Sequence, residues 1–258
     1  MRYSVFAGGK RVRPLLLLET GGAFHGSEDV LLPAAAAVEM VHTYSLIHDD
    51  LPAMDDDTLR RGRPTSHVKF GEATAILAGD ALSTLAFQVL AGLPAEPSRV
   101  VRSIQMLAAA SGTQNGMIAG QVMDLKYEGK SLDLAMLEQL HSAKTGALIR
   151  ASTRIGALLA GADASSLEQL EGIGGRLGLA FQVVDDILDV ESTPAQLGKT
   201  PGKDRKAGKY TFVDALGVDG SRRYAERLTD EAVAEWEKLP ADISRLKELC
   251  LFLLHRKS

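Results

Sequence analysis

The sequence has a single cysteine, Cys250, and few aromatic side chains, which make up 5% of its 258 residues. One cysteine excludes an internal disulfide and fits a reducing compartment such as the cytoplasm. Strands are rich in aromatic and β-branched residues, whereas Ala, Leu and Met, which are plentiful here, favour helices. There is no alternating strand pattern, internal repeat or domain linker. The sequence therefore predicts an all-α protein with one large domain.

Long uncharged apolar runs are also lacking. No such run reaches the length that spans a bilayer, and Met1–Ala7, which is followed by Gly8, is too short for the hydrophobic region of a signal peptide. The formal net charge is only −4, which argues against non-specific binding to nucleic acid. We expect a soluble, cytoplasmic protein that neither binds nucleic acid nor inserts stably into a membrane.

Aspartate, in contrast, is concentrated at two places. The first cluster places five aspartates within nine residues: Asp49, Asp50, Asp55, Asp56 and Asp57. Acid pairs three or four residues apart on a helix repel each other, and a multivalent cation would relieve that repulsion. Ligands that are all oxygen indicate a hard ion, Mg²⁺ or Ca²⁺. A solvated acidic loop is the alternative interpretation of this cluster taken alone.

The second cluster lies far along the chain, in the apolar segment that contains Asp185, Asp186 and Asp189. Asp185 and Asp189 lie one helical turn apart on the same face. Carboxylates in an apolar segment are costly to bury unless they are paired or bound to metal. Mg²⁺ is usually held by one or two carboxylates together with substrate phosphate. Two acidic helix faces therefore predict a site for several Mg²⁺ ions and a diphosphate.

Two further segments combine cations with glycines. Gly8–Pro14 places three cations just ahead of an expected helix, where backbone N–H groups favour an anion. Leu197–Lys209 carries five cations and three glycines, and a loop of this kind can close over phosphates as a lid. A solvated basic turn and a solvated linker are the alternatives.

The helical pattern frames both clusters. We expect helices at Leu31–Met54, Gly71–Leu90, Val100–Gly129, Ser131–Leu158, Ser165–Glu191, Ser221–Leu239 and Ile243–His255. The first of these leads into the first aspartate cluster, and His42 lies two turns before Asp49 on nearly the same face. Gln121 and Asp124, on the third, are expected to make hydrogen bonds within the core and to have no chemical role.

The motifs follow one order along nearly the whole chain: Gly8-Gly9-Lys10-Arg11-x-Arg13-Pro14, His48-Asp49-Asp50-x4-Asp55 with Arg60-Arg61-Gly62, Lys144-Thr145, Phe181-Gln182-x2-Asp185-Asp186-x2-Asp189, and Gly198-Lys199 with Gly208-Lys209. Together they resemble trans-isoprenyl diphosphate synthases of the bacterial short-chain type, which include farnesyl and geranylgeranyl diphosphate synthases. The resemblance implies a bundle of about ten helices around a central cavity, one domain over residues 1–258, and a homodimer. It also implies Mg²⁺-dependent, head-to-tail condensation of isopentenyl diphosphate with dimethylallyl or geranyl diphosphate.

The resemblance assigns roles residue by residue. Asp49 and Asp55, with Asp50 beside them, match the metal ligands of the first motif. Asp185, with Asp189 near it, matches those of the second, and about three Mg²⁺ ions are implied when diphosphate is bound. The allylic diphosphate site is matched by Arg60, Lys144, Lys199 and Lys209. The isopentenyl diphosphate site is matched by Lys10, Arg13, His42 and Arg61. The polar groups near the developing allylic cation are matched by Thr145 and Gln182.

Product length is expected to depend on the helix ahead of Asp49. One isoprene unit adds roughly 5 Å, about one helical turn, so a bulky residue one turn back would form the floor of the cavity. Helix geometry favours Ser45, whose direction is within about 40° of Asp49, over Tyr44 at about 140°. The resemblance favours Tyr44, because farnesyl diphosphate synthases of this kind carry an aromatic residue there. We expect farnesyl diphosphate, with geranylgeranyl diphosphate as the alternative.

Two other functions remain as alternatives. A class I terpene cyclase has a similar helical fold, but its second metal motif usually mixes Asn or Asp with Ser or Thr and Glu. A non-catalytic subunit of a heteromeric synthase typically lacks one aspartate motif, whereas both are present here.

Family members usually carry several dozen more residues ahead of the position of Met1, so we expect the N-terminal helical segment to be short or missing.

Overall fold

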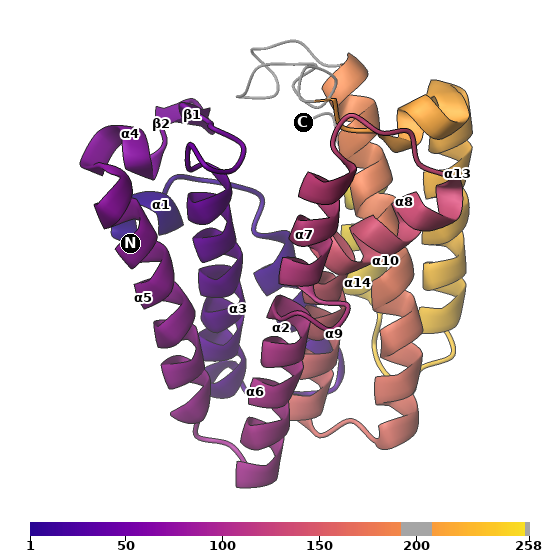
Figure 1. Cartoon of the computed structure of the whole chain (residues 1–258). Coiled ribbons are helices and arrows are strands. Elements are labelled where there is room, and N and C mark those ends of the chain that lie inside the picture. Colours follow the sequence, from indigo (N-terminus) through magenta and orange to yellow (C-terminus); the bar gives the residue numbers. More distant parts are fainter. Residues whose placement is uncertain (192–207, 256–258) are drawn as a thin grey trace.

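The computed structural model describes residues 1–191 and 208–255, which form an all-α bundle (Figure 1). This confirms the predicted fold class. The helices are α1 (Arg2–Val5), α2 (Val12–Ala23), α3 (Glu28–Asp49), α4 (Ser66–Phe70), α5 (Glu72–Ala91), α6 (Pro97–Ser111), α7 (Met117–Tyr127), α8 (Leu134–His141), the π-turn η1 (Ser142–Gly146), α9 (Ala147–Ala160), α10 (Ala164–Glu191), α13 (Phe212–Trp236) and α14 (Ser244–His255).

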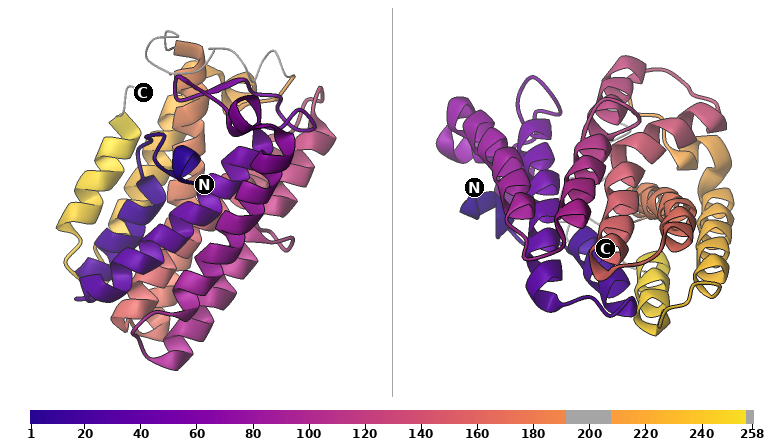
Figure 2. Two further views of the ribbon diagram at one scale, coloured as in Figure 1. Left: turned by 90° about the vertical axis from the view of Figure 1, so that its left-hand side faces the viewer. Right: turned by 90° about the horizontal axis from the view of Figure 1, so that it is seen from below.

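Two long helices lie inside the bundle and carry the aspartate clusters. α3 packs against α2, α5 and α9, and α10 packs against α9, α13 and α14. The end-on view in Figure 2 shows α10 between these neighbours. Both helices end at the same end of the bundle (Figure 1). The two clusters are therefore brought together although more than a hundred residues separate them.

The apolar character of α3 explains its central place. Its buried side chains are mostly small, which lets neighbouring helices approach closely; they include Ala34, Ala35, Ala37, Val38 and Val41. Ser27 precedes the first turn, and Glu28 and Asp29 lie within it, where negative charge complements the helix dipole. The helix ends at Asp49 and not at Met54 as predicted. Pro52 explains the difference, because it lacks an N–H and disfavours helical geometry in the residue before it.

Two other helices were predicted to be longer than they are. The segment Val100–Gly129 forms two helices, α6 and α7, because Gly112 and Gly116 adopt extended backbone conformations with ψ of −154° and −178°. The segment Ser131–Leu158 starts at the N-cap Asp133, whose carboxylate accepts from the Met136 N–H, and the π-turn η1 interrupts it. Both deviations change which side chains face the cavity.

A short hairpin was not predicted. β1 (Leu59–Arg60) pairs antiparallel with β2 (Arg63–Pro64). Its turn residues Arg61 and Gly62 have φ of 53° and 73°, as a two-residue hairpin of the I′ type requires. Strands this short carry no alternating pattern in the sequence. The hairpin turns Arg60 and Arg61 back toward the first aspartate cluster and toward Gly8.

Two helices, α3 and α5, are long and apolar enough to span a membrane by length and composition. In the bundle, 56% of the apolar window of α3 is buried but only 28% of that of α5. α3 is thus a core helix of the bundle, whereas α5 leaves much of its surface uncovered.

Candidate active site

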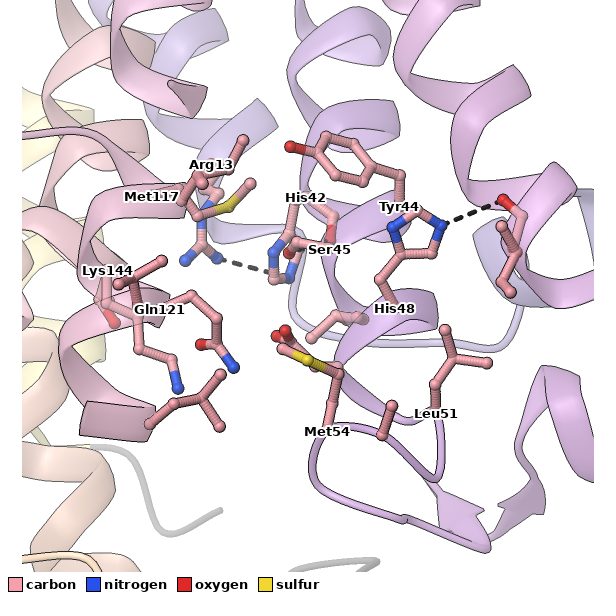
Figure 3. Close-up of a pocket in the computed structure, with 18 residues that line it drawn as sticks. Arg13, His42, Tyr44, Ser45, His48, Leu51, Met54, Met117, Gln121 and Lys144 are labelled. Carbon is pink, nitrogen blue, oxygen red and sulfur yellow. Dashed lines mark hydrogen bonds between the residues drawn. The ribbon is translucent and has the colours of Figure 1, made fainter. Parts of the chain in front are cut away.

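Two adjoining cavities lie beside the C-terminal part of α3. The larger, which we call the apolar cavity, has a volume of about 600 Å³ and is walled mainly by α3 and α7. Figure 3 shows Gln121 and Lys144 on one side of it and Tyr44, His48 and Met54 on the other. The smaller, which we call the polar cavity, has a volume of about 310 Å³. The residues that line both cavities are Leu46, Asp49, Met54, Leu125 and Lys144.

The first aspartate cluster divides between the polar cavity and the hairpin. Asp49 and Asp55 both line the polar cavity, because the turn after α3 folds back and the Asp55 N–H donates to the Asp49 carbonyl at 2.8 Å. Asp50, only 3% exposed, instead accepts from Arg60 Nε at 2.7 Å. Asp56 is exposed, with φ of 48°. The predicted ligands Asp49 and Asp55 therefore share one cavity, and Asp50 holds Arg60 at its edge.

The π-turn η1 places Lys144 and Thr145. Glycines on both sides allow the backbones to meet: a Cβ on Gly120 of α7 would lie 2.2 Å from the Lys144 nitrogen, and one on Gly178 of α10 would lie 2.5 Å from the Gly146 Cα. π-Turns inside helices are frequent at functional sites. Lys144 faces both cavities, and buried Thr145 lines the apolar one.

Asp124 on α7 links the lysines of the polar cavity. Its carboxylate accepts from Lys144 Nζ at 2.6 Å and lies 3.2 Å from Lys209 Nζ. Lys209 also bonds Asp55 at 3.1 Å, so it connects α7 with the first cluster. These two lysines lower the pKa of Asp124 against the opposing effect of burial, which is the largest single influence. Asp124 does make hydrogen bonds as expected, but it makes them to lysines of the polar cavity and not within the apolar core. Lys199 and residues 197–207 of the predicted lid lie outside the described residues.

The second aspartate cluster turns its members in different directions. Asp185 lines the polar cavity across from the first cluster. Asp189, one turn further on, is buried and is not among the residues that line either cavity. Gln182, one turn before Asp186, lines the polar cavity and accepts from the Thr145 hydroxyl at 2.9 Å. The predicted pair Thr145 and Gln182 is therefore in contact, at the boundary between the two cavities.

Of the four residues predicted to bind isopentenyl diphosphate, Arg13 and His42 line the apolar cavity. His42 Nε2 is 3.4 Å from Arg13 Nη1 (Figure 3). Burial and then the Arg13 charge lower the pKa of His42 well below its usual value, so the ring is neutral and Nε2 accepts from the guanidinium. Burial also lowers the pKa of Arg13 to about 10. Arg61 donates to the Gly8 carbonyl, and Lys10 is exposed on the same segment.

Glu39, a residue that sequence reasoning missed, balances this cationic group. It lies one turn before His42 on α3, is 8% exposed, and pairs with Arg11. Its charge raises the pKa values of Arg13 and Arg61 against the larger effect of burial. A lone acid inside an apolar helix was the available signal, since such a group is buried only when paired.

Tyr44 and Ser45 both line the apolar cavity. The Tyr44 ring packs edge-on against His48, with ring centres 5.8 Å apart, and His48 Nε2 is 3.0 Å from the Ile76 carbonyl of α5. Ser45 donates its hydroxyl to the His42 carbonyl at 2.9 Å. Of the two, only Tyr44 presents a large side chain to this cavity.

The donor set of the polar cavity fits Mg²⁺. Asp49, Asp55 and Asp185 supply carboxylate oxygens, the ligands that this ion prefers. Burial raises the pKa of Asp49 to about 6, an effect that a bound cation would oppose. Among the described residues, no three Asp, Glu, His or Cys side chains are close enough to form a complete metal site. Mg²⁺ in proteins is usually held by one or two carboxylates together with substrate phosphate.

Comparison with known proteins places these features in a family. The polyprenyl synthetase family model matches residues 1–249. Farnesyl diphosphate synthase of Escherichia coli (strain K12) is 50% identical over 99% of this chain and 88% of its own. Chloroplastic heterodimeric geranylgeranyl pyrophosphate synthase large subunit 1 of Arabidopsis thaliana is 47% identical over 100% of this chain and 71% of its own. The crystal structure of a geranyltransferase from Helicobacter pylori, complexed with magnesium and isoprenyl diphosphate, superposes with a TM-score of 0.88, is 39% identical, and covers 98% of this chain and 85% of its own.

Proposed function

The chain belongs to the polyprenyl synthetase family, and from that premise we propose that it is a Mg²⁺-dependent short-chain prenyltransferase of the cytoplasm. Acting as one domain over residues 1–258, it condenses isopentenyl diphosphate head-to-tail with an allylic diphosphate to give farnesyl diphosphate. The junction of the two cavities carries the proposal. Asp49 and Lys144 line both, so a diphosphate among the aspartates and lysines is continuous with an apolar space for the prenyl chain.

The roles follow from the positions of the side chains. Lys144 and Lys209 stabilise the departing diphosphate as the allylic C–O bond breaks. Asp49, Asp55 and Asp185 would hold Mg²⁺, which would supply Lewis-acid neutralisation of that charge. The oxygens of Thr145 and Gln182 lie beside the developing cation.

The second substrate then reacts. The group formed by Arg13, Arg61, Lys10 and neutral His42 holds the diphosphate of isopentenyl diphosphate, whose double bond attacks the allylic cation and forms the new C–C bond. The resulting cation loses a proton to the released diphosphate, so no side chain has to act as a base.

An assay with isopentenyl diphosphate and dimethylallyl diphosphate tests the function. We expect the purified protein to lengthen the primer with Mg²⁺ present and to stop when EDTA removes it. A terpene cyclase would release a hydrocarbon or alcohol without consuming isopentenyl diphosphate, and a non-catalytic subunit would do neither. Either result would contradict the proposal.

Replacing Tyr44 by alanine tests the product length. Because the ring occupies the apolar cavity and no reacting group is lost, Tyr44→Ala should shift the products from farnesyl to geranylgeranyl diphosphate and longer chains, with turnover reduced by no more than about threefold. Chromatography of the dephosphorylated products measures the distribution. Ser45→Ala is the matched control, since it removes only a hydroxyl that bonds its own helix. An unchanged pattern in Tyr44→Ala would place the floor elsewhere.

We also propose that two copies associate through α5. Its exposed face carries residues such as Ala73, Leu77, Ala81 and Thr84, and Leu77 is 67% exposed. A face of mainly small and apolar residues at helical spacing, with Asp80 at its margin, suits packing against a second helix. Sedimentation analysis should find a dimer for the wild type and a monomer for Leu77→Asp. Phe252→Asp, at an exposed apolar site on α14, should remain dimeric. A monomeric wild type would rule out this association.

A further inference from the structure

Asp185 and Asp186 are neighbours with different surroundings. Both line the polar cavity, but Asp185 is partly exposed, whereas Asp186 is only 3% exposed. Both carboxylate oxygens of Asp186 are used within the protein: Oδ1 accepts from Gln182 Nε2 at 2.9 Å, and Oδ2 accepts from the Phe212 N–H at 2.8 Å. Successive residues on a helix point about 100° apart, so the motif can serve two purposes.

The Phe212 contact holds Asp186 in place. Phe212 is fully buried and packs between His141 and Tyr224, with ring centres 5.5 and 5.8 Å away. Its carbonyl accepts from the Ser221 hydroxyl at 3.0 Å. The backbone N–H that bonds Oδ2 is therefore fixed, and this directs Oδ1 toward Gln182.

The hydrogen bond between Asp186 and Gln182 then determines whether the Gln182 side-chain amide turns its oxygen or its NH₂ group toward the substrate. A carboxylate only accepts hydrogen bonds, so Gln182 must turn its NH₂ toward Asp186 and its carbonyl oxygen the other way. That oxygen accepts from the Thr145 hydroxyl at 2.9 Å, at the boundary of the two cavities. An oxygen dipole stabilises a nearby cation, whereas an NH₂ group in the same place would oppose it.

We propose that Asp186 is a positioning residue and not a metal ligand: it orients Gln182 so that the amide oxygen faces the developing allylic cation. The inference rests on the proposed prenyl transfer. It distinguishes Asp186, which is buried and bonded through both oxygens, from Asp185, which is partly exposed in the same cavity.

Asp186→Asn tests this orientation. Asparagine keeps the shape but offers one accepting end to two donors, Gln182 Nε2 and the Phe212 N–H. Gln182 relieves the clash by reversing its amide, which turns NH₂ toward the cation. We expect kcat to fall about 100-fold and both KM values to stay within about threefold. The Kd of inorganic diphosphate with Mg²⁺, measured by calorimetry, should also stay within about threefold of the wild-type value. Asp185→Asn should instead raise this Kd more than about tenfold.

A double-mutant cycle shows whether Asp186 acts through Gln182. Gln182→Met removes the amide, and Asp186→Asn added to it should lower kcat by less than about threefold further. Circular dichroism and thermal melting check that the variants fold. If Asp186→Asn does not fold, Asp186→Ser takes its place, because the serine hydroxyl can accept from the Phe212 N–H. The same changes in kcat and KM are expected for it.

Three results would overturn the inference. The first is a loss of Mg²⁺–diphosphate binding as large as that in Asp185→Asn. The second is a fall in kcat of about 100-fold on Asp186→Asn that persists in the Gln182→Met background, and the third is no change in kcat on Asp186→Asn in either background. In each case a wild type that lengthens its primer leaves the proposed function standing. A wild type that does not would instead contradict the function itself.

Discussion

Asp49→Ala and Asp185→Ala should each lower turnover by about 10³- to 10⁵-fold while the fold stays intact. Both residues line the polar cavity, Asp49 from α3 and Asp185 from α10, so each substitution removes one carboxylate from the set proposed to hold Mg²⁺. Steady-state kinetics over a range of Mg²⁺ concentrations measure the effect.

Asp49→Ala should lower turnover but should not lower the stability of the metal-free protein. Burial raises the pKa of Asp49 to about 6, so at pH 7 and without metal the ionised carboxylate opposes folding. In a chelating buffer, Asp49→Ala should therefore melt no lower than the wild type. Asp56→Asn is the matched control: Asp56 belongs to the same aspartate cluster, but it is exposed, and asparagine tolerates its φ of 48°. Near-wild-type turnover in Asp49→Ala and Asp185→Ala would contradict the assigned metal site.

The aspartate clusters could be found from sequence because their signal is local. Five like charges after an apolar helix, and three within another, demand a counter-charge wherever the helices lie. Sequence could not show how the two aspartates of each pair differ in their surroundings. Asp50 bonds Arg60, and Asp186, although it lines the polar cavity, bonds Gln182 and the Phe212 N–H. These contacts depend on a hairpin and on a residue of α13 far along the chain.

Asp124 illustrates a second limit. It is a single acid on a helix interrupted by glycines, and its role depends on Lys144 and Lys209 arriving from two other segments. The π-turn that aims Lys144 inserts an irregularity that no 3.6-residue period reveals. The helices themselves were predictable, but the irregular turns that direct their side chains were not.

Gly178→Ala should have the second large effect, because Gly178 of α10 is the contact that shapes this π-turn. An added Cβ would lie 2.5 Å from the Gly146 Cα, and backbone cannot move aside as a flexible side chain can. We expect a loss of about 1–3 kcal/mol in the free energy of unfolding. Turnover should fall about 100-fold, because a shift of about 1 Å in a positioning element has that effect.

Gly175→Ala, one turn earlier on α10, is the matched control. It shows the general effect of Gly→Ala in this helix without the close backbone contact. Both positions are helical, so both alanines gain up to about 1 kcal/mol in helix propensity. At Gly175 the nearest atom to the new Cβ is the Arg150 Cδ at 3.7 Å, an ordinary contact with a flexible side chain. Gly175→Ala should therefore be as stable as the wild type or more stable, with unchanged kinetics. Urea unfolding and steady-state assays compare the two; if Gly178→Ala matched Gly175→Ala in both, the close approach of α10 would not be what positions Lys144 and Thr145.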